Sequence, residues 1–131
     1  HKFDSPELHA LLDDMKASMI AANGAGLAAP QIGENVRVVI FEVDNNSRYP
    51  NREPIPYTVL INPELMPLPE EKVSDWEGCL SVPGMRGLVP RYPTLRYTGF
   101  DEFGNVAFTP ESYSTKSITL MVCFIRCALP I

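Results

Sequence analysis

This sequence has few of the residues that build disulfide scaffolds, membrane spans or nucleic-acid surfaces. It contains three Cys, an odd and widely spaced set that does not make a disulfide framework. No apolar run approaches the length needed to span a membrane. The net charge is −5, and the sequence contains no run of basic residues. We therefore expect a cytoplasmic protein in a reducing compartment, without membrane or direct nucleic-acid partners.

Acidic residues are absent from the last part of the chain. All 16 Asp and Glu precede Ser114, whereas two of the three Cys lie in the final stretch STKSITLMVCFIRCALPI. This stretch is rich in β-branched and apolar residues, so its exposure would favour aggregation. Another interpretation places Cys123 and Cys127 on one helical face, where they would form a three-thiolate metal site with Cys79.

The length and hydrophobic content of the sequence are sufficient for one folded domain. A length of 131 residues with 45% hydrophobic content supports a single core. The first residues show no signal-peptide pattern, and a start at His1 in place of Met is what a fragment or a trimmed chain would show.

One helix and several strands are predicted. Ser5 is a good N-cap, Pro6 fits the first helical position, and Asn23 with Gly24 should end the helix. Its buried stripe should comprise Leu8, Leu11, Leu12, Met15 and Met19. Strands are expected over 36–43 and 57–62, irregular chain over 45–56 and 63–72, and a β-ribbon over 85–108 that reverses near Gly104-Asn105. The pattern predicts an α+β fold, with the helix packed on mostly antiparallel strands.

Two stretches could carry chemistry. The first is GAGLAAPQIG, residues 24–33, in which the amide of Gln31 could donate to a developing negative oxygen. The local sequence alone favours a plainer interpretation, a helix C-cap followed by a loop that enters a strand. The second is WEGCLSVPG, residues 76–84, in which Cys79 could be a metal ligand or a nucleophile. A lone free Cys is more often a small buried hydrophobe, and neither His1 nor His9 is well placed to act as its base.

Together the two stretches resemble the peptide deformylases. The family's first motif, Gly-x-Gly-Leu-Ala-Ala-x-Gln, is matched from Gly24 to Gln31, and its second, Glu-Gly-Cys-Leu-Ser, from Glu77 to Ser81. The resemblance implies the deformylase α+β fold and removal of the formyl group from N-formylmethionyl peptides. It also implies that Cys79 is one of three protein ligands to a divalent metal, Fe²⁺, Zn²⁺ or Ni²⁺.

The resemblance further implies the roles of the residues around the metal. The Gln31 side chain and the Leu80 backbone N–H would hold the oxyanion. The substrate cleft would be lined by Ala25, Gly26, Glu77 and Gly78.

The family's third motif, His-Glu-x-x-His on a helix, is absent. No His follows His9, so two metal ligands and the proton-shuttling Glu are missing. We therefore expect residues 1–105 to form a deformylase-like core, residues 106–131 to be an aberrant tail, and the motif helix to be missing or altered. The written chain should be catalytically impaired. A non-catalytic relative that binds only peptides or a partner is the alternative, and a small interaction module unrelated to formyl chemistry is a third. A partner chain could cover the face that the missing helix leaves exposed, which would make the protein a homo-oligomer.

The genetic code suggests how the third motif was lost. Thr115-Lys116-Ser117-Ile118-Thr119-Leu120 can be encoded as ACG AAA TCG ATC ACC TTG after a codon that ends in C. Read one base earlier, the same letters are CAC GAA ATC GAT CAC CTT, or His-Glu-Ile-Asp-His-Leu. With permitted synonymous codons, the stretch from Val106 to Ile131 rereads as GFHARVVQHEIDHLDGVFYPMRITD, which resembles a deformylase carboxyl terminus. We hypothesise a single-base frameshift near Asn105.

Overall fold

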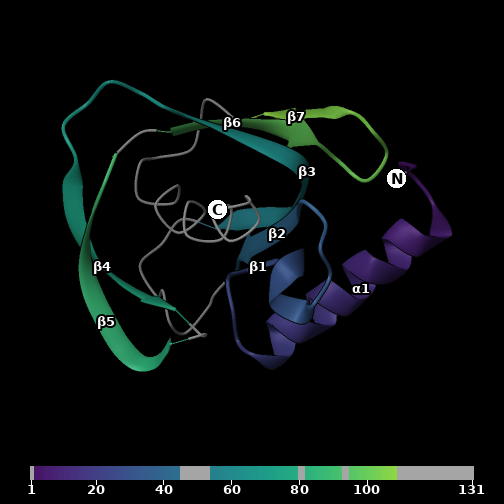
Figure 1. Ribbon diagram of the computed structural model, residues 1–131, viewed down its shortest axis with the longest axis horizontal. Helices are drawn as coiled ribbons and strands as arrows, with labels where there is room; N and C mark the ends of the chain where they lie inside the picture. Colours follow the sequence, from purple (N-terminus) through teal and green to yellow (C-terminus); the bar gives the residue numbers. More distant parts are fainter. Residues whose placement is uncertain (1, 45–53, 80–81, 93–94, 109–131) are drawn as a thin grey trace.

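The computed structural model describes residues 2–44, 54–79, 82–92 and 95–108 (Figure 1). Within these residues one α-helix packs against one face of a five-stranded antiparallel sheet, and a separate two-stranded sheet extends to one side (Figure 1). This arrangement is the α+β architecture predicted from the sequence.

Helix α1 spans Pro6–Ala21 and has the predicted ends. The Oγ atom of Ser5 accepts a hydrogen bond from the N–H of Leu8 at 3.2 Å, which satisfies one otherwise unpaired donor of the first turn. Beyond the last turn, Asn23 has a φ of 51° and Gly24 donates to the carbonyl of Met19, which closes the helix. Of the predicted stripe, three residues are buried and two only half-buried: Leu12, Met15, Met19 and then Leu8, Leu11.

The five-stranded sheet has the order β1-β2-β3-β6-β7, and all of its pairs are antiparallel. Its strands are β1 (Gly26–Ala28), β2 (Val38–Val43), β3 (Ile55–Pro67), β6 (Leu95–Phe100) and β7 (Val106–Phe108). A short 3₁₀ helix, η1 (Ala29–Ile32), joins β1 to β2. The second sheet pairs β4 (Val73–Cys79) with β5 (Val82–Arg91). The predicted strands over 85–108 are present as β5, β6 and β7, but only β6 and β7 pair with each other, whereas β5 pairs with β4 in the second sheet.

Alternate residues of β2 and β3 supply two separate apolar clusters. One cluster joins the sheet to α1 and contains Leu12, Met15, Met19, Ala29, Val38, Ile40, Val59 and Ile61. The other lies on the opposite face and contains Ala25, Ala28, Val39, Phe41, Val43, Ile55, Leu60 and Tyr97. Both faces of the central strands are therefore buried, which is why β2 reads as an almost continuous apolar run.

The prediction of irregular chain over 63–72 is wrong for its first five residues, because β3 continues to Pro67. The register with β6 shifts between Ile61 and Glu64, and Asn62 at this point has a φ of 50°. Pro63 sits in the irregularity, where a missing N–H does not interrupt the ladder. The carbonyl of Pro63 accepts a hydrogen bond from Nη2 of Arg37 at 2.8 Å, and Asn62 donates to the carbonyl of Arg37.

The predicted reversal at Gly104-Asn105 is confirmed, and the amino-terminal segment packs against it. Gly104 has a φ of 88° and donates to the carbonyl of Asp101. The Phe3 ring lies 5.4 Å from that of Phe100, and Asp4 donates to the carbonyl of Glu102 at 2.7 Å. Strand β7 ends at Phe108, just past the boundary proposed at Asn105, and residues 109–131 lie outside the described residues. That domain boundary therefore stays a prediction.

Candidate active site

The first motif forms strand β1 and helix η1, and this turn fixes the side chain of Gln31. Pro30 suits the start of η1, and Gly33 ends it in the left-handed region with a φ of 86°. Gln31 is exposed, and its Oε1 atom accepts a hydrogen bond from the N–H of Ala28 at 2.9 Å. Because the oxygen is engaged, the NH₂ group is the end of the amide that can donate to a ligand.

Ala25 and Gly26 lie on the edge of the five-stranded sheet. Both are buried, and the carbonyl of Ala25 accepts from the N–H of Glu42 on β2 at 2.9 Å. Strand β1 is the end strand in the sheet order, and within the described ranges no other strand pairs with its outer edge. An edge of this kind can receive an extended peptide through main-chain hydrogen bonds.

The second motif ends strand β4 at a large irregularity of the β4–β5 pair. Gly78 lies opposite Arg86, whereas the next residue, Cys79, lies opposite Val82, so residues 83–85 bulge out of the ladder. Gly84 in the bulge has a φ of 76°, which only glycine adopts at little cost. Bulges often occur beside active sites, where they redirect a strand. The structure describes the backbone of Glu77, Gly78 and Cys79, whereas Leu80 lies outside the described residues.

The described residues do not fit a metal site of the expected kind. No group of three His, Cys, Asp or Glu side chains comes together within the described part of the chain. His9, one of only two histidines in the sequence, lies on α1 with its Nε2 atom 2.8 Å from Oδ1 of Asp4. Its ring packs near Phe103 at the β6–β7 turn, away from both motifs. Within the part of the chain that the structure describes, no set of ligands accompanies Cys79, and Cys123 and Cys127 lie outside that part.

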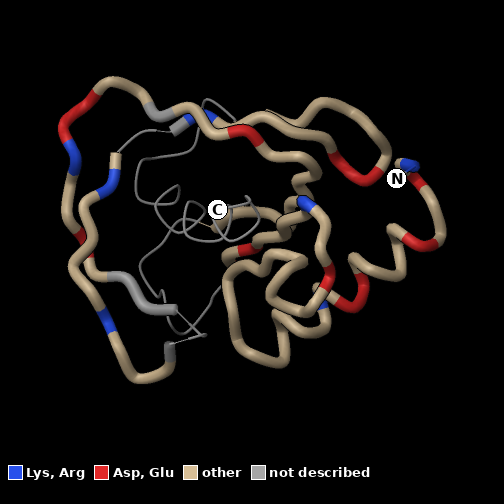
Figure 2. Tube along the Cα trace, in the orientation of Figure 1, with Lys and Arg blue, Asp and Glu red and all other residues tan. Residues whose placement is uncertain are grey.

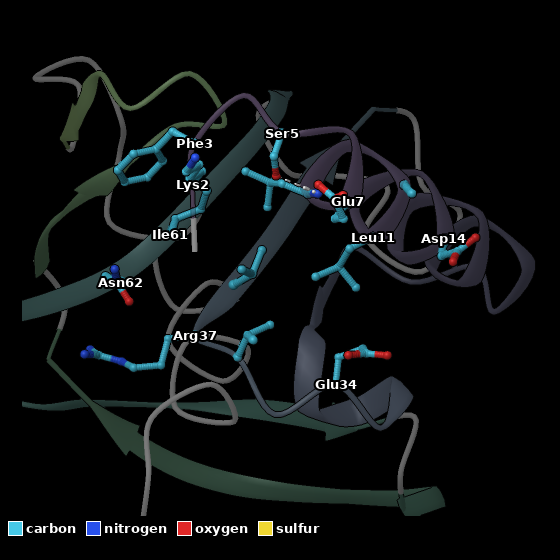
Figure 3. A pocket seen from close by; sticks show the side chains of 14 residues that line it. Lys2, Phe3, Ser5, Glu7, Leu11, Asp14, Glu34, Arg37, Ile61 and Asn62 are labelled. Atoms are coloured by element: carbon cyan, nitrogen blue, oxygen red, sulfur yellow. Dashed lines mark hydrogen bonds between the residues drawn. The ribbon is translucent and has the colours of Figure 1, made fainter.

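Sequence reasoning did not anticipate a cavity of about 450 Å³ on the α1 side of the sheet (Figure 3). It lies between the amino-terminal half of α1, residues 34–38 and the middle of β3, and no residue of either motif lines it. Local sequence offers no signal for it, because its walls come from three separate segments. Leu8 and Leu11, which the sequence predicts to be buried, line this cavity and are only half-buried.

Comparison with known proteins identifies the family. The family described as Polypeptide deformylase matches residues 1–113. The chain belongs to the peptide deformylase family. The Peptide deformylase 1 of Nitrosomonas europaea is 63% identical to this chain over 103 residues. The aligned residues cover 79% of this chain and 58% of the relative. The Peptide deformylase 2 of Ralstonia nicotianae is 59% identical over 104 residues, or 79% and 59% of the two chains.

Solved deformylases have the same fold. A class I type b peptide deformylase from Acinetobacter baumannii with Met-Ala-Ser bound has a TM-score of 0.80 and 32% identity, covering 94% of this chain and 78% of its own. A probable peptide deformylase from Synechococcus phage S-SSM7 has a TM-score of 0.78 and 30% identity, covering 96% and 80%. The chain spans 58% of the length of the first curated relative that it matches. Among the described residues, no helix of this family member is long and apolar enough to cross a membrane.

Proposed function

We propose that this chain is a peptide deformylase whose third motif has been replaced through a one-base change of reading frame near Asn105. In its restored frame it would remove the formyl group from N-formylmethionyl peptides. As written it keeps the first two motifs and lacks the third, so we expect it to bind such peptides without hydrolysing them. Residues 1–105 would be the deformylase core and residues 106–131 the out-of-frame tail.

The observation that carries this proposal is the continuous reread of the tail. The written residues 115–119, Thr-Lys-Ser-Ile-Thr, can be encoded by codons that give His-Glu-Ile-Asp-His when they are read one base earlier. That pentapeptide is the pattern His-Glu-x-x-His, whose two histidines lie one helical turn apart and bind one metal ion. A shifted reading retains two fixed bases of almost every codon, so a family-like tail over residues 106–131 would seldom arise by chance.

The first motif would supply the oxyanion donor and one wall of the cleft. The bond from Ala28 to Oε1 of Gln31 supports this role, because it leaves the amide NH₂ free to face a carbonyl oxygen. The outer edge of β1, with which no strand of the described residues pairs, supports peptide binding beside Ala25 and Gly26. A relative in the family was solved with the peptide Met-Ala-Ser bound.

The second motif would complete the site. Glu77 and Gly78 would line the opposite wall, and the backbone N–H of Leu80 would be the second oxyanion donor. In the restored frame Cys79 would be the sulfur ligand of a divalent metal, with both histidines of the third motif. The bulge that begins at Cys79 supports a site at the end of β4.

Sequencing the coding DNA tests the frameshift directly. We expect the codons of Thr115 to Thr119 to read CAC GAA ATC GAT CAC when they are read one base earlier. If those codons do not permit the shifted reading, the frameshift is excluded.

Expression of both chains tests the function. We expect the frame-restored chain to bind about one divalent metal and to hydrolyse a formyl-Met peptide, and the Cys79→Ser variant of that chain to lose both properties. The written chain, verified by its intact mass, should show neither. Stoichiometric metal together with turnover in the written chain would show that the third motif is dispensable.

A non-catalytic role for the chain as written is the second candidate. It is favoured by the absence of any three-residue group of metal-ligating side chains among the described residues. Sequencing of the coding DNA separates the two, because the codons of a non-catalytic relative would not give the third motif when they are read one base earlier.

A further inference from the structure

The cavity beside α1 is an unfilled end of the apolar cluster that joins the helix to the sheet. Towards the carboxyl end of α1 the cluster is closed by Met15 and Met19, which are 0% and 4% exposed. Towards the amino end, Leu8 and Leu11 remain half-buried and line the cavity instead. The cavity floor is completed by Val38 and Ile61, both buried side chains of the sheet. A ligand here would therefore gain contact with preformed apolar surface.

Charges of opposite sign stand at opposite ends of this floor. Glu7, Asp14 and Glu34 lie on one side, with Leu11 among them, and Lys2 and Arg37 lie on the other side, where Ile61 is next to Lys2 (Figure 3). No ion pair joins any of these five groups to another described residue. Arg37 uses Nη2 for the carbonyl of Pro63, which holds the guanidinium in place and leaves further N–H groups to donate.

We propose that this cavity is a second binding site, for short peptides with apolar side chains and two free ends. The α-ammonium group of the peptide would face Glu7, Asp14 and Glu34, and its α-carboxylate would face Lys2 and Arg37. A volume of about 450 Å³ is in the lower part of the range of small-ligand pockets, which suits a dipeptide. Acidic residues lie along α1 (Figure 2), to which Glu7 and Asp14 belong, and Glu34 follows η1.

This site would distinguish peptides by the state of their amino group. A free amino group is cationic and can pair with the acidic side chains, whereas a formylated amino group is neutral and cannot form an ion pair with them. The cavity would thus select the class of peptide that a deformylation releases over the class that it consumes. The inference does not depend on hydrolysis by this chain, because no motif residue lines the cavity.

Four dipeptides test the assignment by titration into isotopically labelled protein, followed by NMR. They are Leu-Leu, N-formyl-Leu-Leu, Leu-Leu amide and N-formyl-Leu-Leu amide. We expect saturable shifts of the Val38 and Ile61 methyl signals with free Leu-Leu. Blocking either end should weaken binding about fivefold, the effect of one exposed ion pair, and blocking both ends should weaken it more. The preference should shrink at high salt.

Variants at the rim test which side chains select the ends. The double variant Asp14→Asn with Glu34→Gln should reduce the preference for Leu-Leu over N-formyl-Leu-Leu, because it removes two of the three acidic groups. Lys2→Gln should instead reduce the preference for the free carboxylate. Glu70→Gln, a change on an exposed residue outside the cavity, is the matched control and should bind like the parent chain.

The written and frame-restored chains should give the same result, because both contain residues 2–62. The proposal is overturned if Leu-Leu causes no saturable shift of Val38 and Ile61. It is equally overturned if N-formyl-Leu-Leu amide binds as tightly as Leu-Leu, since the cavity would then accept any apolar segment without regard to its ends. If the frame-restored chain fails to hydrolyse a formyl peptide but still binds Leu-Leu in the cavity, the failure concerns the deformylase site and not this proposal.

Discussion

The backbone N–H of Ala28 donates to Oε1 of Gln31 at 2.9 Å, a bond that closes the turn between β1 and η1. The same side chain therefore has a structural end and a donor end. Its oxygen stabilises the turn, while its NH₂ group is the end that can donate to a ligand, and the residue is exposed. Mutations can separate the two roles, because Glu keeps an acceptor and loses the donor, whereas Ala loses both.

In the frame-restored protein, Gln31→Glu and Gln31→Ala should both lower kcat/KM by about 10²–10³-fold, the effect of removing one oxyanion donor. Only Gln31→Ala should also expose the Ala28 amide to faster hydrogen exchange and lower the free energy of unfolding by about 1 kcal/mol. Kinetics with a formyl-Met peptide and amide exchange measure the two effects. Full activity in Gln31→Glu would rule out the donor role.

Ser5→Ala should destabilise the domain through the first turn of α1. The Ser5 hydroxyl accepts from Leu8, and loss of an N-cap of this kind costs about 1 kcal/mol. Ser18→Ala is the matched control, because its hydroxyl donates back to the carbonyl of Asp14 within the helix and contributes little. Urea unfolding of the two variants should show a lower midpoint for Ser5→Ala only. Equal midpoints would mean that the cap carries no net stability.

The sequence predicted the helix well because its ends are determined locally. Ser5 and Pro6 start α1, and Asn23 with Gly24 closes it, by interactions within a few residues. The turn at Gly104 was predictable for the same reason, since its conformation depends on a residue that tolerates positive φ.

Features that depend on distant partners were missed. Strand β3 continues past Pro63 only because its register with β6 shifts at that point, and a single-chain pattern cannot show a register. Strand β4 was not predicted, since WEGC has no alternation, and its pairing with β5 defines it. Cys79 and Gln31 were singled out through resemblance to a family, whereas local patterns favoured a buried thiol and a plain loop.

Gly99→Ala should destabilise the sheet where β3 and β6 approach each other. A Cβ atom at this position would lie 3.0 Å from both the carbonyl oxygen of Ile61 and Cδ2 of Leu60. The backbone cannot yield locally, so we expect a loss of about 1–3 kcal/mol. Gly87→Ala in β5 is the control, because its Cβ would meet no atom closer than 4.0 Å. Chemical unfolding should leave the control within about 0.5 kcal/mol of the parent, or slightly more stable. Similar losses in both variants would point to a general strand effect instead of a close approach.

Tyr57 should make the fold sensitive to alkaline pH. Burial raises the pKa of its phenol to about 12, and the carboxylates of Glu102, Asp13 and Glu42 add to the effect. The unfolded chain, with a pKa near 10, then releases its proton before the folded chain does. The folded state holds more protons between these values, so its stability falls as pH rises from about 10 to 12 and is unaffected below that window.

Comparison with Tyr57→Phe isolates this contribution from other groups that titrate at high pH. The Phe variant keeps the ring that Lys16 approaches at 4.3 Å from its centroid, so the cation–π contact is retained. The difference in unfolding free energy between parent and variant should be constant up to about pH 10 and should then shift in favour of the variant. Urea titrations at several pH values between 8 and 12 measure it. A difference that stays constant across the whole range would mean that the phenol titrates alike in the folded and unfolded chains, and that the surrounding carboxylates do not act on it.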